Sequence, residues 1–102
     1  MAQTITVPTR LADEVVLIRR DLHMHPELGF QEHRTAEIVA ARLRKLGFDV
    51  HERIGKTGVV GVMRGAYPGR TIMLRADMDA LPILEERDHG YRSQAAGRMH
   101  AC

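Results

Sequence analysis

The last residues of the chain carry an imidazole and a thiol two positions apart. Cys102 is the single cysteine, and His100 precedes it in the run Met99-His100-Ala101-Cys102. Thiolate and imidazole are the usual zinc ligands in proteins, so the pair favours a metal site. Two ligands cannot complete such a site, which needs at least three from the protein. The alternative is that Cys102 is a small buried apolar residue with no part in metal binding.

A second group of charged residues follows the apolar run at 71–74. Asp77 and Asp79 lie two positions apart, so their side chains share a face of an extended chain. Ligands bind at the carboxyl ends of strands in open α/β sheets. A carboxylate there can bind a divalent cation or orient a histidine that does. The alternative is that both acids are solvated, or paired with Arg75.

Two other patterns are weaker candidates. His23 and His25 form an H-x-H pair, but Pro26 must end the preceding helix, so we expect the two side chains to diverge. They would then cap helix carbonyls or line a wall. Glu85-Glu86 resembles a carboxylate pair for catalysis, yet it lies in a run of charges and is predicted to be solvated surface.

Two helices are predicted to precede these residues. The first runs from residues 8–9 to 23–24, because apolar residues recur at spacings of four, three and four. The second covers about 31–46, and Gly47 supplies a left-handed stop. The apolar stripe of the first helix consists of Leu11, Val15, Ile18 and Leu22.

The pattern beyond Gly47 changes from helical to alternating. It predicts strands over 48–54 and 59–63, with Gly61 weakening or bulging the second. The apolar run 71–74 predicts a third strand that is buried on both faces. No apolar period follows Pro82, which indicates loop. The predicted fold class is α/β, with two helices followed by about three strands of an incomplete mixed sheet.

Composition limits the function classes. The 102 residues can form one modest core, and a formal charge of +2 with interspersed signs disfavours a nucleic-acid partner. One cysteine excludes an internal disulfide framework. Neither a signal peptide nor a membrane span is predicted, so we expect a cytoplasmic protein with no membrane partner. We divide the chain into a flexible lead-in, 1–10, and a single unit, 11–102.

Four blocks together resemble a known family. The chain is similar to the N-terminal quarter of the metal-dependent amidohydrolases that include hippurate hydrolase, N-acyl-amino-acid amidohydrolase and indole-3-acetyl-amino-acid hydrolase. These enzymes belong to the aminoacylase and carboxypeptidase metallopeptidase superfamily. The blocks are residues 20–30 (RDLHMHPELGF), 57–61 (TGVVG), 75–82 (RADMDALP) and 99–102 (MHAC).

The resemblance implies the N-terminal part of a zinc-peptidase-like catalytic domain, truncated and without the family's lid domain. The intact protein would hydrolyse the amide bond of N-acyl amino acids, such as hippurate-like small amides, with one or two zinc or manganese ions. A water would attack the amide carbonyl while a glutamate accepts its proton. Because the lid often mediates dimers, the intact protein is a candidate homodimer.

The resemblance also assigns residues. Cys102 matches the thiolate metal ligand that opens the family's His-Ala-Cys-Gly-His-Asp motif. Asp77 matches a catalytic-site aspartate that steadies a metal ligand, and Arg75 stands where distant relatives place a metal-binding histidine. The remaining ligands and the general base would lie after residue 102, so we expect the chain alone to be inactive. The alternative is a non-enzymatic truncated remnant, or a small interaction module that uses its open sheet edge.

Overall fold

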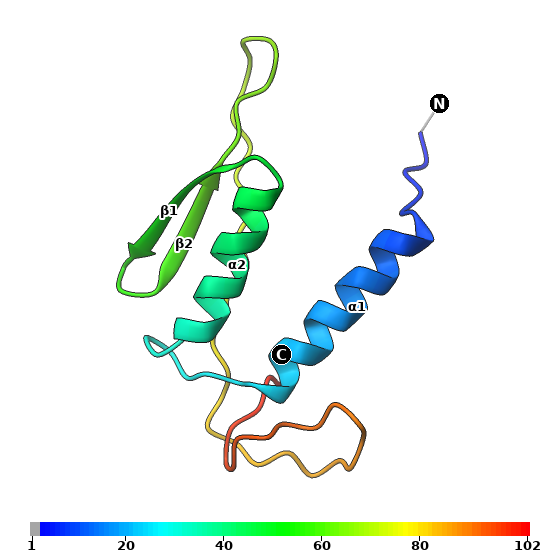
Figure 1. Cartoon of the computed structure of the whole chain (residues 1–102), viewed down its shortest axis with the longest axis vertical. Helices are drawn as coiled ribbons and strands as arrows, with labels where there is room; N and C mark the ends of the chain where they lie inside the picture. The colour runs from blue at the N-terminus through cyan, green and yellow to red at the C-terminus, as the bar shows by residue number, and fades with distance from the viewer. Residues whose placement is uncertain (1–2) are drawn as a thin grey trace.

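The computed structural model describes residues 3–102, which form two helices and one two-stranded sheet. Helix α2 lies beside the β-hairpin, whereas helix α1 stands apart from it (Figure 1). The predicted α/β class is confirmed, with two strands in place of about three. In chain order the elements are α1 (Thr9–Met24), α2 (His33–Lys45), β1 (Asp49–Ile54) and β2 (Gly58–Val62).

Both helices begin and end close to the predicted residues. Helix α1 begins one residue after Pro8, so its first two residues fall inside the predicted lead-in 1–10, of which residues 1–2 lie outside the described residues. Helix α2 is shorter than predicted by about one turn. Gly47 has a φ of 88°, which confirms the left-handed stop, and its N–H donates to the Arg44 carbonyl at 3.0 Å.

A carboxylate from outside the helix caps the N-terminus of α2. The residue at the cap position, Glu32, makes no capping hydrogen bond with its side chain. Instead Glu27 accepts hydrogen bonds from the N–H groups of Arg34 and Thr35 at 2.9 and 2.6 Å, and from the Thr35 hydroxyl at 2.7 Å. The turn between the helices is thereby tied to the first turn of α2.

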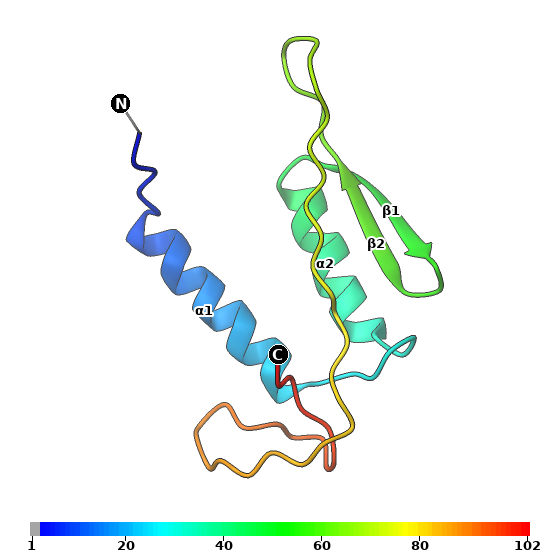
Figure 2. The same cartoon turned by 180° about the vertical axis from the view of Figure 1, so that it is seen from behind.

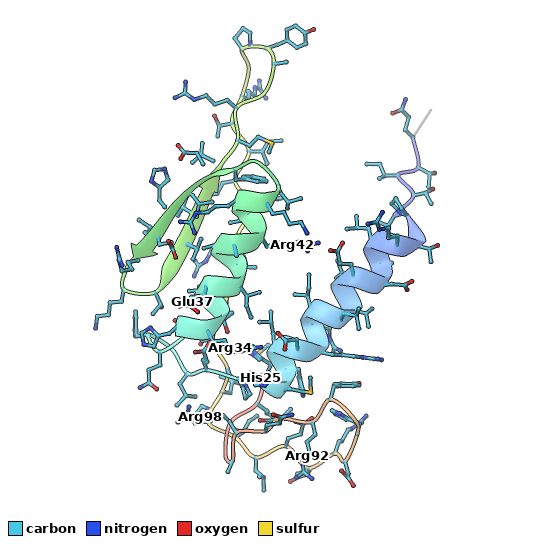
Figure 3. The ribbon with its side chains drawn as sticks, viewed as in Figure 1. His25, Arg34, Glu37, Arg42, Arg92 and Arg98 are labelled. Atoms are coloured by element: carbon cyan, nitrogen blue, oxygen red, sulfur yellow. The ribbon has the colours of Figure 1, made fainter. Side chains whose placement is uncertain are left out.

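Ion pairs connect the two helices. The Arg34 guanidinium donates to both carboxylate oxygens of Asp21, at 2.9 and 3.0 Å, and Arg42 pairs with Glu14. His25 caps the end of α1 through a ring nitrogen 2.9 Å from the Asp21 carbonyl, which is the first of the two roles considered for it from the sequence. Figure 3 shows His25 and Arg34 at this junction, with Arg42 further along α2.

The hairpin is antiparallel and packs against α2. Its irregularity lies in β1 between His51 and Ile54, not at Gly61, which pairs regularly with Val50. The absence of a side chain at Gly61 serves the packing instead. A Cβ there would lie 3.1 Å from side-chain carbons of Leu43 and Phe48, closer than ordinary van der Waals contact.

The predicted strand at 71–74 is wrong for this structure. The segment is extended but forms no ladder, and Ile72 and Leu74 are 85% and 92% exposed. The physical reason is that no strand of residues 3–102 pairs with its backbone and neither helix covers its faces. Figure 2 shows that the chain leaves β2, turns in a projecting loop and then descends as an extended stretch towards the final loop, with this segment near its start.

The described residues bury little apolar surface. Among them only Ala40 and Ala80 are buried hydrophobic residues, and the predicted stripe of α1 is covered only in its second half, at Ile18 and Leu22. Neither helix in residues 3–102 combines the length and apolar character needed to cross a bilayer.

Candidate functional site

Distant stretches of the chain meet at the C-terminal end of α1. The Ala80 N–H donates to the Glu27 carbonyl at 2.7 Å, which joins the RADMDALP block to the turn between the helices. Leu81 and Met99 exchange two backbone hydrogen bonds at 2.9 and 3.1 Å, which closes the loop between them. In Figure 1 this loop, coloured orange to red, lies below α1 and brings the C-terminus beside it.

Three titratable side chains converge inside this junction. His23, in the last turn of α1, places its Nε2 atom 2.9 Å from Oε1 of Glu85. His89 approaches the same oxygen with its own Nε2 atom at 2.8 Å. The three ligand atoms lie within 4.8 Å of one another, so that one ion could contact all three. We call these residues the His–Glu–His cluster.

The surroundings hold Glu85 in its ionised form. Its second oxygen, Oε2, accepts the Ser93 N–H at 2.6 Å. That hydrogen bond and the one from His23 lower the pKa of Glu85 against the opposing effect of burial. On the outer side, the Tyr91 ring stacks on His89 at 4.0 Å between centroids, and the Arg20 guanidinium lies 4.7 Å from the Tyr91 ring.

His100 lies close to this junction with one ring nitrogen free. Its Nε2 atom is buried and has no hydrogen-bond partner within residues 3–102. Burial lowers the pKa of His100 and His23 lowers it further, whereas Asp79, through its charge and a backbone hydrogen bond, raises it. The ring is therefore neutral near pH 7, the form in which histidine binds metals.

Asp77 and Cys102 are both on the surface. Asp77 is hydrogen-bonded to Arg75 at 3.1 Å, the pairing considered from the sequence, and its side chain is 74% exposed. Cys102 carries a free, exposed thiol. Neither residue is part of the His–Glu–His cluster. Their predicted roles in catalysis and metal binding therefore stay predictions.

Sequence reasoning missed the cluster. The prediction that Glu85 is solvated is wrong, because its side chain is only 4% exposed and its carboxylate is hydrogen-bonded to His23 and the Ser93 N–H and lies 2.8 Å from the His89 ring. The side chains of His23 and His25 have separate partners, Glu85 and the Asp21 carbonyl, in agreement with the predicted divergence. The partners His23 and Glu85 are 62 residues apart, so no local pattern could have joined them.

The chain is similar in sequence to several carboxypeptidases and amidohydrolases, although no model of a known protein family matches it. It is 50% identical over 93 residues to thermostable carboxypeptidase 1 of Saccharolobus solfataricus. It is 49% identical over 92 residues to hippurate hydrolase of Campylobacter jejuni, and 47% identical over 97 residues to N-acyl-L-amino acid amidohydrolase of Geobacillus stearothermophilus. These matches cover 90%, 90% and 91% of this chain, but only 24%, 24% and 26% of the relatives.

Comparison with solved structures leads to the same group of hydrolases as the sequence comparison. A dinuclear metal-binding peptidase of the M20 family from Bacillus subtilis superposes with a TM-score of 0.86 at 37% sequence identity. The match covers 94% of this chain and 27% of that protein. The resemblance carried by the four sequence blocks is thereby confirmed, and the chain spans about a quarter of the length of its curated relatives.

Proposed function

We propose that this chain is part of an enzyme that hydrolyses the amide bond of N-acyl amino acids. Its relatives in sequence and in fold are the metal-dependent amidohydrolases and peptidases of the M20 family. The observation that carries this proposal is the 49% and 47% identity to proteins named for that chemistry, over about nine-tenths of the chain. Hippurate-like small amides are the substrates we would test first.

The side chains of His100 and Cys102 have the chemistry of ligands for a divalent metal ion. His100 offers a buried, neutral ring nitrogen without a partner, and the Cys102 thiol is accessible two residues later. A divalent ion held there would polarise the amide carbonyl and make an attacking water more acidic. A soft thiolate donor favours zinc over manganese. The related peptidase from Bacillus subtilis is described as dinuclear, which supports one or two ions.

Asp77 is proposed as a positioning residue for this site. The exposed hydrogen bond with Arg75 does not hold its carboxylate firmly, because surface ion pairs contribute at most about 1 kcal/mol. The carboxylate is thus free to turn and accept the second ring N–H of a metal-bound histidine, which fixes the orientation of the ligand.

A site with only two protein ligands, His100 and Cys102, binds an ion weakly, since catalytic zinc sites use three protein ligands. We expect the 102-residue chain to bind Co²⁺ through Cys102 only at high concentration, with a thiolate-to-cobalt charge-transfer band that Cys102→Ser removes.

Hydrolysis of N-benzoylglycine and N-acetylated amino acids should be assayed on the product of the complete reading frame that contains these residues. Release of free amino acid that Cys102→Ser abolishes would support the proposal. An active Cys102→Ser protein would refute the metal role, and no hydrolysis of any N-acyl amino acid would refute the activity.

A further inference from the structure

We infer that the His–Glu–His cluster of His23, Glu85 and His89 is a binding site for a divalent cation of the zinc class. The inference does not depend on the proposed function, because the cluster shares no residue with Cys102 or Asp77. Two imidazoles and one carboxylate are a donor set that zinc accepts, and they leave a fourth position for water.

The spacing of the donor atoms is close to what such an ion needs. A tetrahedral zinc with bonds of about 2.0–2.1 Å holds its ligand atoms about 3.3 Å apart. The two Nε2 atoms lie 2.9 and 2.8 Å from Oε1 of Glu85, so each contact has to open by only about half an ångström. Both imidazoles would bind the ion in the neutral form, through the Nε2 atoms that now face the carboxylate.

The site is also oriented and partly enclosed. The Ser93 N–H holds Oε2 of Glu85 at 2.6 Å, and this turns Oε1 towards both imidazoles. Tyr91 fixes the plane of the His89 ring by stacking on it. The side chains of His23 and Glu85 are almost fully buried, while His89 is 27% exposed, so an ion would enter past His89.

The backbone adds a favourable field. His23 lies in the last turn of α1, where the aligned peptide dipoles place partial negative charge. A cation is stabilised at that end of a helix. A bound ion would also connect α1 to a loop residue 62 positions away, and so fix the loop of 81–99 against the helix.

The experiment uses the 102-residue chain with Cys102→Ser, which silences the thiol, and titrates it with Co²⁺ and Zn²⁺ alone. We expect one Co²⁺ per chain, with visible d–d absorption and no thiolate charge-transfer band. His89→Gln keeps a donor for Glu85 but removes a ligand, and should weaken Co²⁺ binding by at least about 10–100-fold. His33→Gln, at an exposed histidine of α2 outside the cluster, should leave it unchanged.

A second measurement keeps the result independent of how well the variant folds. In the Cys102→Ser chain with all histidines in place, Zn²⁺ should shift the ring NMR signals of His23 and His89 together, while that of His33 stays in place. Absence of bound Co²⁺, equal binding by His89→Gln, or unshifted rings on addition of Zn²⁺ would each show that the cluster is only a hydrogen-bond network, and would overturn the inference.

Discussion

Glu27 is the residue whose removal should weaken α2 most directly, because its carboxylate accepts three hydrogen bonds at the start of that helix. In Glu27→Ala two backbone N–H groups lose their acceptor. We expect the free energy of unfolding to fall by about 1–2 kcal/mol, the usual cost of losing a helix cap. Urea unfolding followed by circular dichroism measures it. Glu37→Ala, at an exposed glutamate of the same helix (Figure 3), is the control and should change stability by less than about 0.5 kcal/mol.

The same carboxylate makes stability depend on pH. Burial raises the pKa of Glu27, but the hydrogen bonds from Thr35 and Arg34 outweigh it, so the pKa is lower than the ordinary 4.5. A carboxyl with a lowered pKa in the folded state contributes stability above its unfolded pKa and loses it as pH falls through the folded value. We therefore expect the urea midpoint to drop below about pH 4.5. Glu27→Gln should flatten this drop, and an identical pH profile in that variant would contradict the assignment.

Residue roles could be predicted from the sequence where the partner is local. Capping by His25 and pairing of Asp77 with Arg75 were each one of the alternatives that the local sequence offered, and both are found. Glu85 shows the limit of this reasoning. Its neighbours in the sequence are charged, so the sequence predicts a solvated side chain. The partners of Glu85 are His23 of α1 and Ser93 of the loop that follows Glu85.

At the scale of elements, periodicity predicted both helices and the hairpin because these contacts are made within a few residues or across one turn. The segment 71–74 differs, since a continuous apolar run predicts burial only where other elements cover it. Within residues 3–102 nothing pairs with this segment. The prediction is wrong because no element of residues 3–102 covers this segment, although its local pattern is apolar.

The hairpin turn depends on a glycine at its closing position. A Cβ at Gly58 would lie 2.5 Å from the carbonyl oxygen of Ile54, so the backbone of the hairpin must move to admit it. We expect Gly58→Ala to destabilise the chain by about 1–3 kcal/mol. Gly65→Ala is the matched control, because no atom lies within 4 Å of a Cβ there and its φ is not in the left-handed region. Thermal unfolding by circular dichroism compares the two, and equal melting temperatures would contradict this account of Gly58.

The molecule as a whole is extended for its length. Its radius of gyration is 16.1 Å, against about 13 Å for a compact domain of 100 residues. Large apolar side chains are exposed on α1 and along 71–74, while the buried apolar residues among those described are two alanines. Such an arrangement leaves apolar surface available to other molecules.

Self-association through 71–74 is therefore expected at the scale of the whole chain. The segment combines an exposed apolar run with unpaired backbone groups, the features that drive edge-to-edge pairing of strands. Replacing Ile72 and Leu74 with lysine adds charge to that edge and should convert a concentration-dependent mixture into a monomer in sedimentation velocity. Adding the same two charges in the N-terminal segment, with Gln3→Lys and Thr6→Lys, should leave the association in place. If both doubly substituted chains associate equally, the surface responsible lies elsewhere, with the exposed apolar side chains of α1 as the next to be replaced.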